Sequence, residues 1–351
     1  MRSSCKKYLA VAMSGISLAA GAQSALAVEI NDKLSIYGYG HQAYLRASDN
    51  AYLEADKKGD LSYGALALVF AATLDDKTKV WASLHNTLER TLIDWVYVNR
   101  QMSAGLSLRA GQVKLPLGLY NEIRDIKYLH LSTLAPALYQ EATRIADEAY
   151  RGIGLNYNHD IGVGSLSWDG YVGQIVNLEV VSGMAGEKMR RLVGGRVTYS
   201  TPVDGLRFMV SAYDGKVEKM GGLEDGRRTW IVSADYKANN LDLKAEYAPM
   251  KFFGMKSKTY YAQAGYTLAE KWTPFARYDY VTTDSTQSDV PSFYQKTASL
   301  GVGYRFSDNI GFRLENHWSR GYALPVASGE IVAGAGKNNW NMFAASINFI
   351  F

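Results

Sequence analysis

The sequence predicts an all-β fold, a transmembrane antiparallel β-barrel of about sixteen strands. Segments of about ten residues alternate apolar and polar side chains along most of the chain. Turn-forming residues end these segments, and short connections alternate with long ones in the second half of the chain. A composition with 33 Gly and 25 Tyr but only 7 Pro also favours many strands joined by tight turns.

The first 27 residues have the parts of a cleaved secretory signal peptide. A basic start precedes an uncharged run from Tyr8 to Gly21, and Ala25-Leu26-Ala27 then supplies the small-x-small pattern that signal peptidase cleaves. We therefore expect a signal peptide over residues 1–27 and a single barrel domain over residues 28–351.

The overall composition excludes several classes of protein. Hydrophobic residues make up 47% of the chain and charged residues 21%, which rules out a disordered chain. A formal charge of +4 over 351 residues does not indicate nucleic-acid binding. Cys5 is the one cysteine and lies in the expected signal peptide, so a disulfide framework is excluded. After Val28 no uncharged apolar run is long enough for a transmembrane helix.

The alternation separates an apolar face from a charged face in each expected strand. In the run 272–280, for example, Arg277 and Asp279 lie opposite Trp272, Ala276 and Tyr278. Enclosing such charges in a dry core would be very costly unless they were paired. In a wide barrel, the charged face lines a wet lumen and the apolar face meets lipid.

Sixteen segments qualify as strands, and two features in the early ones need explanation. Gly64–Leu74 is apolar on both faces, which a buried seam between subunits would explain, and the register near Trp95 is ambiguous. The expected strand centres are Tyr39, Leu68, Ala82, Val96, Leu108, Leu155, Trp168, Val197, Val210, Val232, Ala245, Ala264, Ala276, Leu300, Leu314 and Ile347.

The connections fall into two classes that alternate along the chain, as in barrels with tight turns at one end and long loops at the other. The expected short turns are 159–162, 202–205, 239–240, 269–271 and 307–309. The expected long loops are 175–188, 217–226, 252–257, 282–293 and 321–338.

The end of the chain carries the main family resemblance. Phe343, Ala345, Ile347, Phe349 and Phe351 share one face of the last expected strand. A terminal Phe with hydrophobic residues at alternating positions resembles the signature of Gram-negative outer-membrane porins. The run 33–38, Lys-Leu-Ser-Ile-Tyr-Gly, is similar to the first strand of such porins.

This resemblance implies an outer-membrane location and a water-filled channel for small hydrophilic solutes and ions. It also implies contact with outer-membrane lipid, a homotrimer, an external loop folded into the lumen, and assembly machinery that recognises the Phe351 strand. The run Arg109–Gly118 is similar to a motif of the phosphate-selective branch of porins, so a substrate-selective anion channel stays open as an alternative.

Residues 113–148 are the candidate constriction loop. They form the longest stretch without clean alternation, and they lie where porins place the inward-folded loop. We expect its carboxylates to face arginines on the wall, so that the field between them selects solutes. Part of it, Leu138–Glu148, has good helix formers. The candidate site residues are Glu122, Arg124, Asp125 and Lys127 on the loop and Arg109, Arg196, Arg207, Arg277, Arg305 and Arg313 on the wall.

No motif indicates catalysis, a metal or a cofactor. The five histidines lack metal-ligand spacing, and His317 with Ser319 is a pair that chance readily supplies. Two readings from other classes remain open. A small-barrel outer-membrane hydrolase should have fewer strands, and an adhesin or structural barrel should have a plugged lumen. The sequence favours the porin reading, with no enzyme activity.

Overall fold

The computed structural model describes residues 27–87, 91–176, 188–218, 224–252 and 254–351. The expected signal peptide therefore lies outside the described residues, except Ala27. The strands are β1 (Val28–Asn31), β2 (Leu34–Ala47), β3 (Gly64–Asp75), β4 (Thr78–Thr87), β5 (Thr91–Ser103), β6 (Leu106–Lys114), β7 (Ala149–Ile161), β8 (Gly164–Val176), β9 (Lys188–Ser200), β10 (Leu206–Glu218), β11 (Glu224–Ala238), β12 (Leu241–Phe252), β13 (Met255–Tyr266), β14 (Trp272–Thr282), β15 (Tyr294–Arg305), β16 (Ile310–Gly321) and β17 (Asn339–Ile350).

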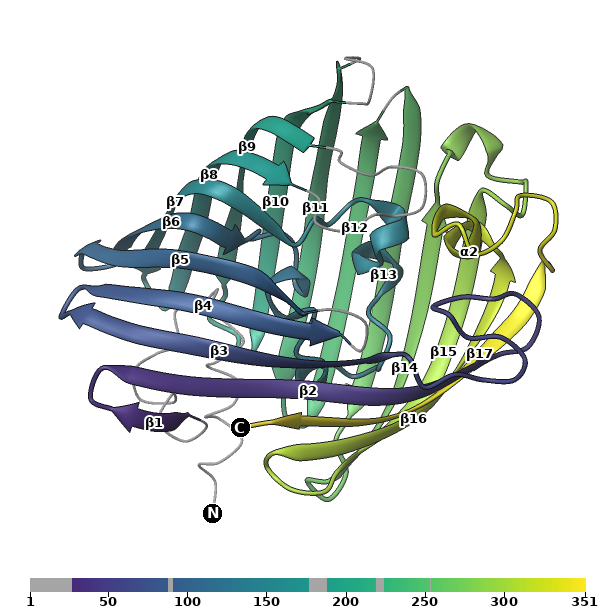
Figure 1. The fold of residues 1–351 in the computed structure, drawn as a ribbon, viewed down its shortest axis with the longest axis horizontal. Coiled ribbons are helices and arrows are strands. Elements are labelled where there is room, and N and C mark those ends of the chain that lie inside the picture. Colours follow the sequence, from purple (N-terminus) through teal and green to yellow (C-terminus); the bar gives the residue numbers. More distant parts are fainter. Residues whose placement is uncertain (1–26, 88–90, 177–187, 219–223, 253) are drawn as a thin grey trace.

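Strands β2–β17 form a closed antiparallel barrel of sixteen strands, and β1 is one extra strand paired with β2 (Figure 1). Each strand pairs with its neighbours in the sequence, and β17 closes the ring on β2. Every expected strand centre lies within a strand, so the predicted fold class is confirmed. The short strand β1 was not expected.

The two ends of the chain meet where the barrel closes. Gly38 and Phe351 exchange two backbone hydrogen bonds of 2.8 and 2.9 Å. A Cβ atom at Gly38 would collide with the ring of Phe351, so glycine at this position leaves room for the terminal ring. The runs that resembled the first and last strands of porins are therefore direct neighbours.

Because neighbouring strands are antiparallel, the long connections gather at one end of the barrel and the short turns at the other (Figure 1). The long-loop end carries residues 48–63, 115–148, 283–293 and 322–338, the last of which includes the short helix α2 (Ala323–Ala327). The long loop expected over 252–257 is wrong. Pairing continues to Phe252↔Met255, so Phe252 belongs to β12 and residues 255–257 belong to β13.

The two faces of the wall differ as the sequence indicated. Leu314 is 54% exposed on the outward face of β16, whereas Arg313 and Glu315 beside it are 8% and 3% exposed.

Near Trp95, the register shifts between Ser83 and Leu84 of β4, which leaves Asp94 without a direct partner across the strands. This β-bulge turns both Asp94 and Trp95 inward and explains the ambiguous alternation there.

The interior contains an apolar core as well as charges. Loop residues such as Leu115, Leu117 and Leu138 form one buried cluster with wall residues such as Val69 and Tyr171. Three inward residues of β3, Ala67, Val69 and Ala71, belong to the same buried cluster, which accounts for the apolar inward face of this strand. Among the described residues, no helix has the length and hydropathy needed to cross a membrane.

Candidate pore constriction

The long loop between β6 and β7, residues 115–148, lies inside the barrel and is held by short 3₁₀ turns. These are η2 (Asn121–Ile123), η3 (Lys127–Leu129), η4 (Ala137–Tyr139) and η5 (Glu141–Thr143). The helical structure expected in part of Leu138–Glu148 is confined to the short 3₁₀ turns η4 and η5, and Arg144 adopts a left-handed conformation with φ of 56° that ends η5. Buried polar groups of the loop bond to the wall, which is how a non-regular segment tolerates an interior position.

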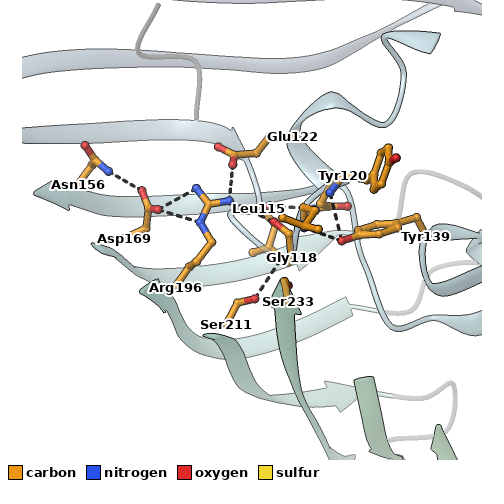
Figure 2. Close-up of polar contacts among 12 residues, drawn as sticks. Leu115, Gly118, Tyr120, Glu122, Tyr139, Asn156, Asp169, Arg196, Ser211 and Ser233 are labelled. Carbon is orange, nitrogen blue, oxygen red and sulfur yellow. Dashed lines mark hydrogen bonds and ion pairs between the residues drawn. The ribbon is translucent and has the colours of Figure 1, made fainter. Parts of the chain in front are cut away.

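One charged cluster joins the loop to β7, β8 and β9 (Figure 2). The Arg196 guanidinium lies 2.6 Å from the Glu122 carboxylate on η2 and 2.9 Å from the Asp169 carboxylate on β8. Asn156 on β7 donates a 2.9 Å hydrogen bond to Asp169. Strand register explains the cluster, because Asp169 is directly opposite both Arg196 and Asn156 and all three point inward.

A second cluster surrounds the Lys114 ammonium at the end of β6. Its Nζ atom lies 2.9 Å from Asp94 and 2.6 Å from Asp125 of the loop. Burial by itself would raise the pKa of Asp125, but the attraction of the Lys114 ammonium outweighs it and holds the pKa well below its usual range. Asp125 is therefore ionised and paired.

The same carboxylates and His85 have ligand atoms within 4.8 Å of one another, which is a metal-like grouping. Lys114 already places a positive charge between Asp94 and Asp125. A divalent cation would have to share that space with the ammonium, so the grouping fits an ion-pair network better than a metal site.

Glu148 ends the loop beside this cluster. Its carboxylate lies 3.1 Å from Arg124 Nε and 3.9 Å from Lys114 Nζ. Burial, together with the negative charges of Asp125 and Asp94, raises the pKa of Glu148 to about 7, against the opposing pull of Lys114 and Arg124. One carboxyl group of the cluster thus titrates near neutral pH.

Glu246 on β12 fastens the middle of the loop. Its carboxylate accepts hydrogen bonds of 2.6 Å from the Tyr139 hydroxyl, 2.7 Å from Tyr261 and 2.9 Å from the Leu119 backbone N–H. The Tyr139 hydroxyl in turn accepts a 3.1 Å hydrogen bond from the backbone N–H of Tyr120 (Figure 2). The network satisfies backbone groups that would otherwise be buried without partners.

The other side of the loop is held by β14 and β16. Arg277 pairs with Asp279 at 2.6 Å and donates a 2.8 Å hydrogen bond to the Leu134 carbonyl. Glu315 accepts a 2.9 Å hydrogen bond from the backbone N–H of Thr133. The loop is therefore tied to opposite sides of the barrel and crosses the lumen.

The remaining candidate residues are divided between the loop and the wall. Arg313 donates a 3.1 Å hydrogen bond to the Tyr128 carbonyl, and Lys127 donates a 2.8 Å hydrogen bond to the Arg124 carbonyl. Among the last three wall arginines, Arg109 is buried and points inward on β6. Arg207 pairs with Asp235 at 2.6 Å. Arg305 donates a 2.9 Å hydrogen bond to the Glu270 carbonyl near the short-turn end of the barrel.

Sequence reasoning missed several residues of this site. Asp169 lies between Trp168 and Gly170 in an alternating run, so the sequence could have predicted that its side chain points inward. The sequence could not have predicted which residue pairs with its carboxylate. Asp94 was hidden by the β-bulge. Arg227 on β11 forms an ion pair with Asp147 of the loop, and no sequence signal singled it out.

Comparison with known proteins rests on structure. No family model matches the chain, and no curated protein matches its sequence. OmpF of Salmonella typhi, solved in complex with daunomycin, is 13% identical with a TM-score of 0.64, over 93% of this chain and 100% of that chain. The anion-selective porin from Comamonas acidovorans is 13% identical with a TM-score of 0.58, over 91% of this chain and 99% of that chain. The chain has the porin fold.

A third match, OmpT, an outer membrane protein of Vibrio cholerae, is 12% identical with a TM-score of 0.59, over 92% of this chain and 98% of that chain. Likenesses at this level of identity concern the fold alone. The resemblance read from the first and last strands is thereby confirmed for the fold. Within this porin fold, the loop and the wall charges described above form the candidate constriction.

Proposed function

We propose that this chain is an outer-membrane porin, a water-filled channel through which small hydrophilic solutes and ions diffuse passively without any chemical reaction. The closed sixteen-stranded wall with apolar side chains outward and charges inward supports this proposal most strongly. We further propose that residues 1–27 are a cleaved signal peptide and that the Phe351 strand is recognised by the assembly machinery.

We propose that loop 115–148 constricts the lumen and gives it a preference for cations. Lys114 at the end of β6 and the loop residues Arg124 and Lys127 are each no more than 8% exposed, and Arg144 of the loop is half-buried. Two of the loop's acidic side chains retain clear contact with solvent, Glu148 at 31% and Glu141 at 52%, whereas Glu122, Asp125 and Asp147 are 11–13% exposed. A passing ion therefore meets more carboxylate than ammonium, which favours cations at the narrowest part.

We propose that the porin is a homotrimer, as the trimer form reported for Vibrio cholerae OmpT suggests by analogy. The outward face of β3–β5 supports a subunit interface there. Leu66, Leu84, Ile93 and Val96 are 40–55% exposed on it, and a groove lined partly by Ile93 and Val96 lies beside them. A second copy would bury these side chains.

The hydrolase alternative is not supported by the geometry. Ser299 and His317 are 2.7 Å apart, and His317 lies 3.3 Å from Glu315, which imitates a catalytic triad. Ser299 is 1% exposed, however, and Glu315 accepts hydrogen bonds from the loop backbone. The buried Ser299 hydroxyl does not face a substrate, and Glu315 serves to anchor the loop.

The deciding experiment is single-channel recording of the purified protein in a planar bilayer, with the reversal potential measured in a salt gradient. We expect stepwise insertions in groups of three and a reversal potential of the sign that indicates cation preference. Folded and inserted protein that conducts no current would contradict the porin proposal and favour the structural barrel with a plugged lumen.

A further inference from the structure

Two loops at the long-loop end are joined across the line where the barrel closes. Loop 48–63 follows β2 and loop 322–338 precedes β17, and these two strands are the first and last of the ring (Figure 1). The Ser48 backbone N–H donates a 2.8 Å hydrogen bond to the Asn341 carbonyl, which continues the strand pairing into the base of loop 48–63. We call the two loops together the cap.

The tip of loop 48–63 is a two-residue hairpin turn with unusual central residues. Tyr52 and Ala55 exchange two backbone hydrogen bonds of 3.1 Å across it. Leu53 and Glu54 between them have φ of 53° and 64°, a left-handed conformation in which such turns usually have Asn or Gly. Leucine and glutamate do not favour this conformation, so the turn needs support from outside the loop.

Glu330 of the other loop supplies that support. Its carboxylate accepts hydrogen bonds of 2.9 Å from the Leu53 N–H and 3.0 Å from the Glu54 N–H, one on each oxygen. The Ser328 hydroxyl donates a further 3.0 Å hydrogen bond that holds the carboxylate in place. Because hydrogen bonds to an ionised carboxylate are stronger than those between neutral groups, Glu330 clasps the two loops together.

Asn50 makes a second connection between the loops. Its side-chain amide donates a 2.8 Å hydrogen bond to the Lys337 carbonyl, and its side-chain oxygen accepts one of 2.7 Å from the Lys337 N–H. The Asn50 side chain therefore bonds to the other loop as a neighbouring strand would. An aspartate at this position would lack the donor, so the connection is specific for the amide.

The cap packs on the constriction loop. Tyr52 and Ala55 of one loop and Leu324 of the other form a buried apolar cluster with Leu134 and Ala137 of the constriction loop. Side chains of β2, β14 and β17 complete the cluster, and its buried members are each no more than 9% exposed. Water therefore has little access between the cap, the constriction loop and this side of the wall.

One group in this packing is unfavourable. The Tyr52 hydroxyl is buried and has no hydrogen-bond partner among the described residues, while its ring packs edge-on against Trp340 at 6.1 Å. A buried hydroxyl without a partner destabilises the packed arrangement. The hydrogen bonds of Glu330 and Asn50 offset this effect, so their loss should release the cap from the constriction loop.

We propose that Glu330 and Asn50 are specificity-determining residues of the channel, because they hold the cap against the constriction loop and thereby limit the size of the solutes that pass. The limit is steric, and it acts in series with the charge preference of the constriction. Release of the cap would widen the lumen beside β2, β14 and β17. This inference rests on the proposed porin function.

Two variants open the same clasp with opposite changes in charge. Glu330→Gln removes a negative charge and places an amide NH₂ against one of the two backbone N–H groups. Asn50→Asp adds a negative charge and places a carboxylate oxygen against the Lys337 carbonyl. An effect of the electric field alone would therefore have opposite signs in the two variants.

Two further variants serve as controls. Asp289→Asn removes a negative charge from an exposed position on loop 283–293, outside the cap, and should behave as the parent protein does. Tyr52→Phe removes the unpartnered hydroxyl and keeps the ring, so it should hold the cap more firmly.

Swelling of proteoliposomes in neutral sugars measures the size limit, as the rate for a tetrasaccharide divided by the rate for a pentose. We expect this ratio to rise roughly tenfold in both clasp variants, as the released population grows by the factor that about 1.4 kcal/mol represents. The ratio should not rise in Asp289→Asn or Tyr52→Phe. Ratios that stay unchanged in both clasp variants, or that move in opposite directions, would overturn the proposal.

Tryptic cleavage after Lys57 and Lys58 reports release of the cap without reference to transport, because both lysines are exposed on loop 48–63. We expect faster cleavage in Glu330→Gln and Asn50→Asp and slower cleavage in Tyr52→Phe. Faster cleavage with an unchanged sugar ratio would refute this inference alone. A parent protein whose liposomes admit no sugar and carry no current would refute the proposed function instead.

Discussion

Arg196 illustrates how single residues hold this interior together. It has two carboxylate partners, Glu122 on the loop and Asp169 on the neighbouring strand. The second partner keeps the guanidinium compensated when the first is removed, so the wall should tolerate loss of the loop contact. The loop side of the pair can therefore be tested without leaving a buried charge alone.

Glu122→Gln should lower the cation preference of the channel while the barrel stays folded. The change removes a loop carboxylate next to the proposed constriction, and Arg196 keeps its pair with Asp169. Reversal potentials in a salt gradient measure the effect. The matched control is Glu224→Gln at the exposed rim of β11, which should leave the reversal potential unchanged. An equal shift in both variants would show that the effect is non-specific.

The carboxyl group of Glu148 predicts that both the stability and the cation preference of the protein change with pH near neutrality. Its pKa is raised to about 7, so the protonated form is favoured in the folded protein relative to the unfolded chain. Stability from this group is fully present below the usual glutamate pKa and is lost as pH rises through about 7. Cation preference should change in the opposite sense, falling as the pH drops through 7 because the carboxylate is neutralised.

Glu148→Gln should remove both effects. Reversal potentials and thermal unfolding between pH 4 and pH 9, set on each side of the raised pKa, measure them. A parent protein whose selectivity is constant across that window would contradict the assignment of a raised pKa to Glu148.

At the scale of elements, the constriction depends on how the loop is fastened. Its backbone N–H groups bond to Glu246, Asp279 and Glu315, which lie on β12, β14 and β16. The apolar side chains of the loop pack on the strands at the other side of the barrel. A loop held on both sides should behave as a fixed constriction with little gating motion.

Tyr139→Phe should loosen this fastening. It removes the hydroxyl that joins the Tyr120 N–H to Glu246, and leaving such a buried donor without a partner costs about 1–3 kcal/mol. We expect lower stability in denaturant and larger current fluctuations in single-channel records. Tyr260→Phe, on the outward face of β13, is the matched control. Quiet channels in both variants would argue against a role for Tyr139 in holding the loop.

At the scale of the whole molecule, the outward surface is not uniform around the barrel. The arc over β3–β5 exposes Leu66, Leu84, Ile93 and Val96, whereas the long-loop rim of β11–β16 exposes basic side chains. The apolar arc is suited to contact with a second copy of the chain.

Ile93→Asn should weaken the trimer, and Val210→Asn should not. The two side chains are 55% and 53% exposed on the outward faces of β5 and β10, so a similar amount of apolar contact with detergent is lost in both. Only Ile93 lies on the proposed subunit interface. Gel filtration in detergent and resistance of the oligomer to dodecyl sulfate measure the outcome. Equal dissociation of both variants would place the interface elsewhere.

Most of the fold could be predicted from the sequence because each strand of a wide barrel meets lipid or water directly. In segments such as Ile310–Ser319, apolar and polar side chains alternate because one face of the strand meets lipid and the other meets water. Where a strand faces the loop, as in β3, the inward side is apolar and the signal is lost. The bulge at Asp94 also broke the alternation by a single residue.

The sequence by itself determined the strand number, the alternation of turns and loops, and the position of the long loop. Only the tertiary structure decided which charges meet, such as Glu122 with Arg196 or Asp94 with Lys114. The physical reason is that alternation is set one residue at a time by the solvent on each face, whereas an ion pair depends on strand register and on how a loop folds back across the lumen.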